Sequence, residues 1–225
     1  MEADHRATRA IAVISDHLEE LRVGRPSVVK AAALSPKGAK TLAQILDAAH
    51  RVFLREGHAG LSMRKVADEA GLALGNVNYY FNSKRALIEA TLREALAEYV
   101  EEHIRQYDEG RDAPLDILLN VVTFYIANGR ASNRLFFQIW GFAASDDAAR
   151  ELIRELYRPI GRFIYYLVRA ARPDATETRI REIVLQLFSL EEGVKLFIGI
   201  GPDDDPALKS AEAHVRALAE KVILA

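Results

Sequence analysis

The 225-residue sequence contains no cysteine. Disulfide bonds, zinc sites built on thiolates and thiol catalysis are therefore excluded. Long apolar segments are also missing: the longest uncharged run, residues 70–83, is too short to cross a bilayer and contains polar residues. The N-terminus carries Glu2 and Asp4 and has no unbroken apolar segment, so it does not resemble a secretory signal. These absences predict a cytoplasmic protein with no membrane partner.

The motifs of common enzyme classes are absent as well. There is no G-x-S-x-G, Walker sequence, dinucleotide fingerprint or H-E-x-x-H. The six histidines are scattered, and no two of them are three or four residues apart. We therefore expect neither catalysis nor a cofactor or metal site.

Charge is unevenly distributed along the chain. The formal net charge is only −2, but residues 37–88 hold eight basic and four acidic residues, so that window is +4 and the remainder −6. Such asymmetry indicates an anionic partner for the basic part, although chance clustering gives the same pattern.

Apolar residues recur at helical spacing along almost the whole chain, and no strand-like alternation persists, so the protein is predicted to be all-α. An amphipathic helix is expected over residues 5–22, followed by a linker containing proline and glycine. Further helices are expected from Leu42 to about Gly57, over 63–70 and 74–80, and after Ser83. Beyond these, helices are expected near 115–129, 132–144, 147–171, 175–199 and 206–224, with a kink or break at Pro159.

The stretch LGNVNYYFNSKRAL, residues 74–87, is unusual for a charge-rich chain. Two short helices, 62–70 and 74–80, joined by a turn containing glycine, have the spacing of a helix-turn-helix. In the second helix, Val77 and Phe81 are predicted to face inward with Leu72. The predicted outward residues are Gly75, Asn76, Asn78 and Tyr79.

Those outward side chains suit DNA. Asparagine pairs with adenine in the major groove, glycine permits close backbone approach, and tyrosine or lysine binds phosphate oxygens. Lys84, in the first turn of the next helix, opposes the helix dipole, and a phosphate there would resolve the conflict. The alternative is that the tyrosines pack in a small bundle and the asparagines belong to turns.

The run ILDAAHRVFLREGHAGLSMRKVADEAGLALGNVNYYFNSKRALIEATL resembles the N-terminal DNA-binding domain of the TetR family of bacterial transcriptional regulators. The chain departs from the family pattern at Ala73 and Leu74, where a capping Ser or Thr and a basic residue are usual, and at Tyr80, where His is common. The residues predicted to bind DNA are Ser62, Arg64, Lys65, Ala73, Leu74, Gly75, Asn76, Asn78, Tyr79, Tyr80 and Lys84.

The resemblance implies three parts: an N-terminal extension over 1–37, a helix-turn-helix domain over 38–99, and a larger helical domain over 100–225 for effector binding and dimerisation. Residues 115–170 hold more than half of the chain's aromatic residues. They are candidates for a ligand pocket, although any single aromatic residue more commonly belongs to plain core. The predicted ligand-binding residues are His103, Asn120, Phe124, Phe136, Phe137 and Trp140.

The last two helices carry apolar stripes, and in the family the equivalent pair joins two subunits. The predicted dimer contacts are Leu187, Leu190, Leu208, Val215 and Leu218. The expected function is therefore a homodimeric, ligand-responsive repressor that binds a palindromic DNA operator and a small-molecule effector. The alternatives are a DNA-binding protein controlled by a protein partner, or a small-molecule enzyme.

Overall fold

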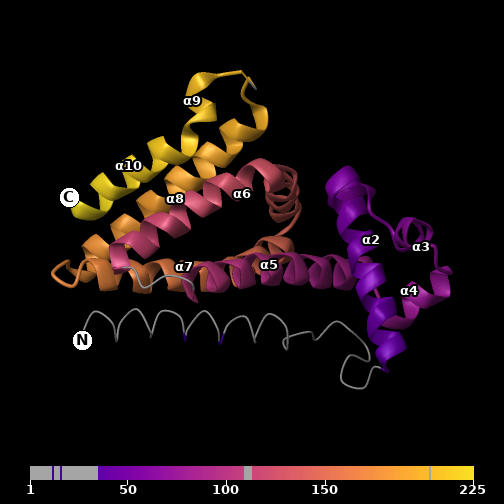
Figure 1. The fold of residues 1–225 in the computed structure, drawn as a ribbon. Helices are drawn as coiled ribbons and strands as arrows, with labels where there is room; N and C mark the ends of the chain where they lie inside the picture. The colour runs from indigo at the N-terminus through magenta and orange to yellow at the C-terminus, as the bar shows by residue number, and fades with distance from the viewer. Residues whose placement is uncertain (1–11, 13–15, 17–34, 109–112, 203) are drawn as a thin grey trace. The chain divides into compact units, whose positions relative to one another are not determined.

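A computed structural model describes residues 12, 16, 35–108, 113–202 and 204–225 (Figure 1). Every regular element in these residues is helical. The elements, numbered as in Figure 1, are α2 (Pro36–Gly60), α3 (Met63–Ala70), α4 (Leu74–Tyr80), α5 (Lys84–Asp108), α6 (Pro114–Ala143), α7 (Asp147–Ala171), α8 (Glu177–Ile200), α9 (Pro206–Lys209) and α10 (Ala211–Leu224). The helix predicted over 5–22 lies outside the described residues. No described helix has both the length and the apolar composition that a membrane span requires.

The chain divides into two compact units. Of the described residues, the first unit contains 35–101 and 137–156, and the second contains 12, 16, 102–108, 113–136, 157–202 and 204–225. The predictions for 63–70, 74–80 and 147–171 agree with α3, α4 and α7, and α7 continues through Pro159.

The prediction of two helices over 115–144 is wrong, because α6 is one helix from Pro114 to Ala143. Gly129 does not end a helix. A Cβ atom built on Gly129 would lie 2.9 Å from Cγ of Lys195, so the missing side chain allows α6 and α8 to pack closely. Glycine commonly marks the end of a helix, but Gly129 lies inside α6 and allows a close packing contact.

The core of the first unit joins α2, α3 and α4 to the start of α5. Its fully buried side chains include Ile45, Val52, Phe53, Val66, Val77, Phe81 and Leu87. Residues 137–156 belong to the same unit: the ring of Phe142 lies 5.7 Å from that of His58, and Arg85 donates to Asp146 over 2.6 Å.

Gly57 is the predicted stop of the helix from Leu42; α2 instead runs on to Gly60 and is kinked at Gly57. Its φ of 67° and ψ of −177° lie in a region that side chains other than glycine rarely adopt. A Cβ atom at this position would also collide with Oε1 of Gln138. Gly71, which ends α3 in the left-handed conformation with φ 66° and ψ 32°, has no atom within 4 Å of such a Cβ.

The two glycines form a matched pair for mutation. Gly57→Ala is expected to lower the free energy of unfolding by roughly 2–3 kcal/mol, because its φ and ψ lie in a region nearly restricted to glycine and the end of the Gln138 side chain must also move. Gly71→Ala is expected to cost about 1 kcal/mol, because its left-handed conformation is less strained for other residues. Urea denaturation of both variants measures the difference. Equal losses would contradict the greater strain assigned to Gly57.

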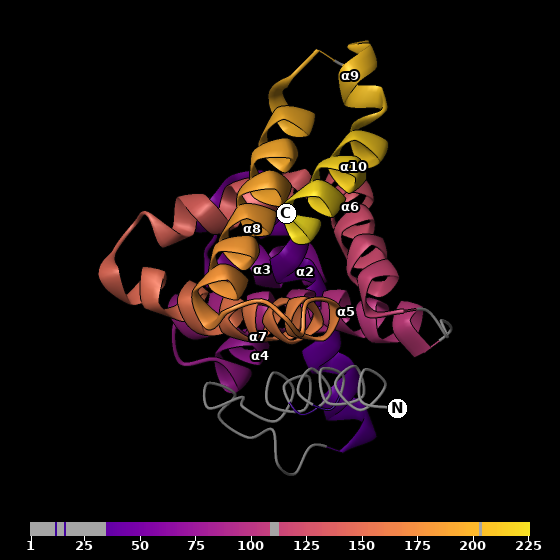
Figure 2. The same cartoon turned by 90° about the vertical axis from the view of Figure 1, so that its left-hand side faces the viewer.

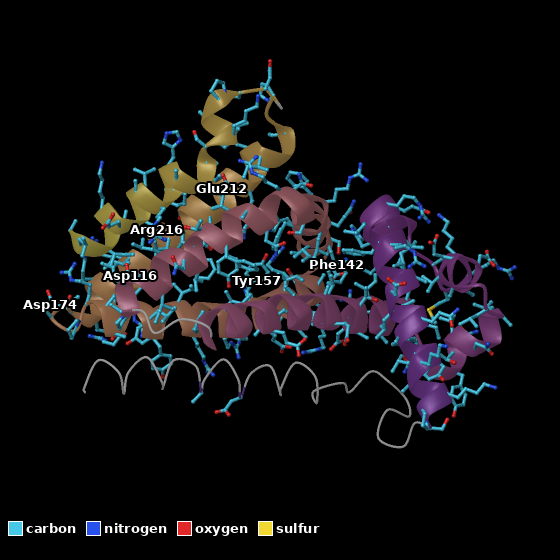
Figure 3. All side chains as sticks on the ribbon, in the orientation of Figure 1. Asp116, Phe142, Tyr157, Asp174, Glu212 and Arg216 are labelled. Atoms are coloured by element: carbon cyan, nitrogen blue, oxygen red, sulfur yellow. The ribbon has the colours of Figure 1, made fainter. Side chains whose placement is uncertain are left out.

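In the second unit, α8 and α10 lie side by side in both views (Figures 1 and 2). The buried residues of this contact are Ile180, Ile183 and Leu187 on α8 and Val215, Ala219 and Ile223 on α10. Polar contacts tie α10 to α6: Arg130 pairs with Glu212 over 2.7 Å and Arg216 donates to Asn120 over 2.9 Å (Figure 3). Helix α10 is therefore held to α8 by an apolar contact and to α6 by polar contacts.

Candidate nucleic-acid interface

The helices α3 and α4 and the turn between them form a compact pair in which each boundary has a local cause. Ser62 caps α3, since its Oγ accepts from the N–H of Lys65 over 3.2 Å. Gly71 ends α3, and the N–H of Leu72 donates to the carbonyl of Ala67 over 2.9 Å. Ala73 precedes α4 without a side-chain cap, as its sequence predicts.

Helix α4 has one buried face and one exposed face. Val77 and Phe81 are fully buried, as predicted. Gly75, Asn76 and Asn78 are exposed, and the side chain of Tyr79 is 49% exposed. Among the described residues, none outside the backbone of α4 and the two chain neighbours lies within 4 Å of a Cβ built on Gly75, so the helix backbone there is open to a large partner.

Tyr80 is among the residues predicted to bind DNA, but its side chain is buried and that prediction is wrong. The side chain is only 6% exposed, and its hydroxyl donates to the carbonyl of Gly38 over 3.1 Å. Tyr80 lies three residues after Val77, so helical geometry places it on the inner side. It ties α4 to the first turn of α2. Leu74, three residues before Val77, is half-buried for the same reason.

A groove beside α4 was not predicted. It has a volume of about 530 Å³ and is lined by Ser35, Lys37, Gly38, Thr41, Asn76, Tyr79 and Tyr80. Ser35 caps the start of α2, accepting from the N–H of Gly38 over 3.2 Å. A helix N-terminus next to a lysine favours an anion. The signal was Ser35-Pro36, an N-cap residue followed by proline, ahead of Lys37.

Internal contacts hold several of the basic residues. Arg51 and Arg55 both donate to Glu69 of α3, over 2.8 and 3.1 Å, and these hydrogen bonds lower the pKa of the Glu69 carboxyl. Lys65 pairs with Glu56 and donates to the carbonyl of Gly60 over 3.0 Å. These pairs brace α2 against α3, and they occupy three of the eight basic side chains of residues 37–88.

The remaining basic side chains are more accessible. Lys37, Lys40 and Arg64 are exposed. Lys84 is half-exposed, and its Nζ donates to the carbonyl of Ala59 over 3.1 Å. That contact places the ammonium between the end of α2 and the start of α5. The groove and these four residues are the parts of the surface that best suit a phosphate backbone.

The predicted ligand residues are divided between the two units. Phe124 and Phe136 lie in the second unit, whereas Phe137 and Trp140 form an edge-to-face pair, 5.7 Å between centroids, in the first. Asn120 is exposed and accepts from Arg216. The side chain of His103 lies outside what the structure describes.

A buried polar cluster in the second unit was missed. It contains Glu191 and Lys195 of α8, each 2% exposed, with Tyr125 and Phe136 of α6 beside them. The sequence signal was a Glu and a Lys one helical turn apart in residues 183–200, where Glu192 is the only other charged residue. Among the described residues, no group of three or more His, Asp or Glu side chains has a geometry that suits a metal ion.

Two of the predicted dimer contacts do not lie on the surface, so the prediction is wrong for them. Leu187 is fully buried and Val215 is 2% exposed, both within their own chain. Leu190 and Leu208 are half-buried, and Leu218 is 46% exposed. The exposed apolar residues of α8 are Leu185, Leu196, Phe197 and Ile200, here named the α8 stripe, and those of α10 are Leu218 and Leu224. Helix α8 has apolar residues on both its buried and its exposed side, and the predicted contact Leu187 belongs to the buried side.

Comparison with known proteins places the helix-turn-helix in a family. Residues 45–91 match the model of bacterial regulatory proteins of the tetR family. The HTH-type transcriptional regulator BetI of Burkholderia thailandensis is 28% identical over 182 residues, which cover 78% of this chain and 92% of that protein. An uncharacterized HTH-type transcriptional regulator in the dhlA 5' region of Xanthobacter autotrophicus is 29% identical over 121 residues. That match covers 52% of this chain and 60% of the relative, less than two thirds of its length.

The fold has close counterparts among solved structures. A putative transcriptional regulator from Saccharomonospora viridis, solved in complex with choline, superimposes with a TM-score of 0.69 at 17% identity. The superposition covers 81% of this chain and 96% of the other. At this identity the likeness shows the fold, and the matches at residues 45–91 show the class of its DNA-binding helices. Residues 45–91 thus form a helix-turn-helix of the tetR type, and the chain is similar to bacterial HTH-type transcriptional regulators.

Proposed function

We propose that the protein is a homodimeric repressor that binds a palindromic operator and releases it when a small-molecule effector binds. The observation that carries this proposal is the exposed polar face of α4, which lies beside the capped N-terminus of α2. In this proposal, residues 38–99 form the DNA-binding domain, residues 100–225 bind the effector and the second subunit, and no residue is catalytic.

The DNA contacts divide into two kinds. Asn76 and Asn78 are exposed on α4 and read base edges, with Gly75 allowing close approach. Tyr79, Lys84 and the first turn of α2 bind phosphates. Ser62 orients α3 through its cap, and Lys65 stays with Glu56, so both have supporting roles. Tyr80 fixes the position of α4 relative to α2.

Dimerisation is supported by the apolar side chains that α8 and α10 leave exposed. Leu185, Phe197 and Ile200 are 68%, 58% and 66% exposed in the single chain. Exposed apolar residues gathered on one element mark an interaction surface. A two-fold dimer presents two copies of α4 to two half-sites, which a single seven-residue helix cannot do.

An effector response is supported by a solved structure of the same fold. The Saccharomonospora viridis regulator was solved with choline, so a chain of this fold accommodates a small organic molecule.

Selection of DNA from a random pool by the purified protein tests the proposal as a whole. We expect an inverted repeat, and a set of selected sequences without two-fold symmetry would contradict it.

Base reading and phosphate binding are expected to respond differently to mutation. Asn76→Ala is expected to change preference at one base pair by roughly 1–3 kcal/mol. Lys84→Ala is expected to weaken binding to all sequences alike and to reduce the salt slope by about one unit. Fluorescence anisotropy with the selected operator and with single-base variants, at several salt concentrations, measures both effects.

Lys221→Ala, which removes an exposed lysine of α10, serves as the charge-matched control and is expected to leave the salt slope unchanged. The assignment of the two faces fails if Lys84→Ala alters sequence preference while Asn76→Ala binds every operator variant as the wild type does.

A further inference from the structure

The buried cluster of the second unit consists of Glu191, Glu192 and Lys195 on α8, Tyr125 and Phe136 on α6, and Tyr157 on α7. These six residues belong to one compact unit, and Figure 3 labels Tyr157. Charged residues are almost never fully buried unless they are paired. The question is therefore which groups pair with the buried Glu191 and Lys195.

Lys195 lies over aromatic faces. Its Nζ is 4.3 Å from the ring centroid of Phe136 and 5.1 Å from that of Tyr125. Both distances are within the range of a cation–π contact. Its acceptor among the described residues is Oε1 of Glu192, at 3.3 Å, the long end for a charged hydrogen bond. The aromatic faces thus already hold an ammonium group, supplied by the chain itself.

The carboxyl groups of the cluster are less well satisfied than the ammonium. Oε1 of Glu191 and Oε2 of Glu192 are buried and have no hydrogen-bond partner among the described residues. An unpaired buried acceptor costs about 1–3 kcal/mol. Two carboxyl groups face one ammonium, so the cluster has one more acid than base.

We propose that this cluster is the effector site and that the effector is an organic cation, an ammonium carried on an apolar body. The proposal rests on the effector response proposed above. Glu191 supplies the counter-charge, and the faces of Phe136 and Tyr125 receive the cationic head. The effector displaces the Lys195 ammonium from these faces. The Lys195 stem fills the space left by Gly129, so its displacement alters the packing of α6 on α8.

An anionic effector fits the cluster less well. The single ammonium is shared with Glu192, and the second carboxyl would repel an anion. A metal ion has no set of ligands among the described residues. Burial raises the pKa of Glu191 to about 8, although Lys195 opposes the shift and Glu192 adds to it. A bound cation favours the ionised carboxylate, so binding near neutral pH releases a proton.

The charge preference can be tested with three probes of similar shape: tetramethylammonium, tert-butanol and pivalate, which are cationic, neutral and anionic. Isothermal titration calorimetry of the full-length protein is expected to detect only the cation. Its affinity is expected to rise with pH up to about 8, as Glu191 ionises beside Glu192, Lys195, Tyr125 and Tyr157. Binding of pivalate instead, or of no probe, would overturn the proposal.

Two variants are expected to act in opposite directions. Glu191→Gln keeps the shape but removes the charge, and it is expected to weaken tetramethylammonium binding roughly tenfold or more and to abolish the pH dependence. Lys195→Met removes the internal cation, and it is expected to strengthen binding. Glu151→Gln, at an exposed carboxylate of α7, is the control. Equal losses in both variants, as a purely structural cluster would give, would contradict the cation site.

The cation site and the proposed regulation can be separated in wild-type protein. Operator affinity is measured by anisotropy with and without tetramethylammonium. Cation binding together with operator release supports both. Cation binding without any change in operator affinity keeps the site but contradicts the effector response. Tight operator binding with no cation binding keeps the DNA-binding function and overturns the site.

Discussion

Phe197→Glu is expected to make the protein monomeric and to weaken operator binding roughly a hundredfold or more. Phe197 is 58% exposed in the single chain and lies in the α8 stripe between Leu196 and Ile200. In a two-fold interface the same residue occurs on both subunits, so the substitution introduces two carboxylates into one apolar contact. Burying charges without partners opposes association strongly. A monomer then contacts only one half-site and loses the linked second contact.

Sedimentation velocity measures the first effect and anisotropy with the selected operator measures the second. Ala148→Glu adds the same charge at an exposed position of α7 and is expected to remain dimeric. Leu187→Ala is an informative contrast, because Leu187 is fully buried within its own chain. It is expected to lower stability by about 2–5 kcal/mol without a specific effect on dimerisation. A dimeric Phe197→Glu with wild-type affinity would show that the α8 stripe is not the subunit contact.

Local signals allowed the helix-turn-helix to be predicted in detail. Ser62 and Gly71 mark the two ends of α3 through a cap and a left-handed residue. Val77 and Phe81, four residues apart, identify the buried face of α4. Each of these rules depends on residues close in sequence, and the structure agrees with each of them.

Tertiary packing decided the features that were predicted wrongly. Tyr80 has a polar hydroxyl, and its acceptor is the carbonyl of Gly38, 42 residues away in the chain. Gly129 has the usual signature of a helix end, but its role depends on Lys195 of another helix. Neither partner can be recognised from local sequence.

The dimer face and the buried cluster show a second limit. Apolar residues surround most of α8, so periodicity alone does not tell which side meets the chain's own core and which meets a partner. Glu191 and Lys195 have the spacing of a solvated ion pair, and sequence alone favours that interpretation. Their burial follows from the packing of α8 against α6. The sequence predicted how many helices this part of the chain has, but not which of them pack together.

Glu191→Gln is expected to change the pH dependence of stability, whatever the effector is. Burial raises the pKa of the folded-state carboxyl to about 8, above its ordinary value of 4.5. Below about pH 4.5 the carboxyl is protonated in both states, and its contribution to stability is fully present. As pH rises, the unfolded state ionises first, so the free energy of unfolding falls until about pH 8. At about 1.4 kcal/mol per pKa unit, the loss is up to roughly 5 kcal/mol.

Glutamine does not titrate, so the variant lacks this decline. The difference in free energy of unfolding, variant minus wild type, is therefore expected to increase between pH 5 and pH 8 and to level off above that. Urea denaturation at one fixed protein concentration measures it, because the stability of a dimer depends on concentration. Glu151→Gln, at an exposed carboxylate, is expected to show no comparable trend. A difference that stays constant with pH would mean that Glu191 is ionised in the folded protein at neutral pH, with a partner that satisfies its charge.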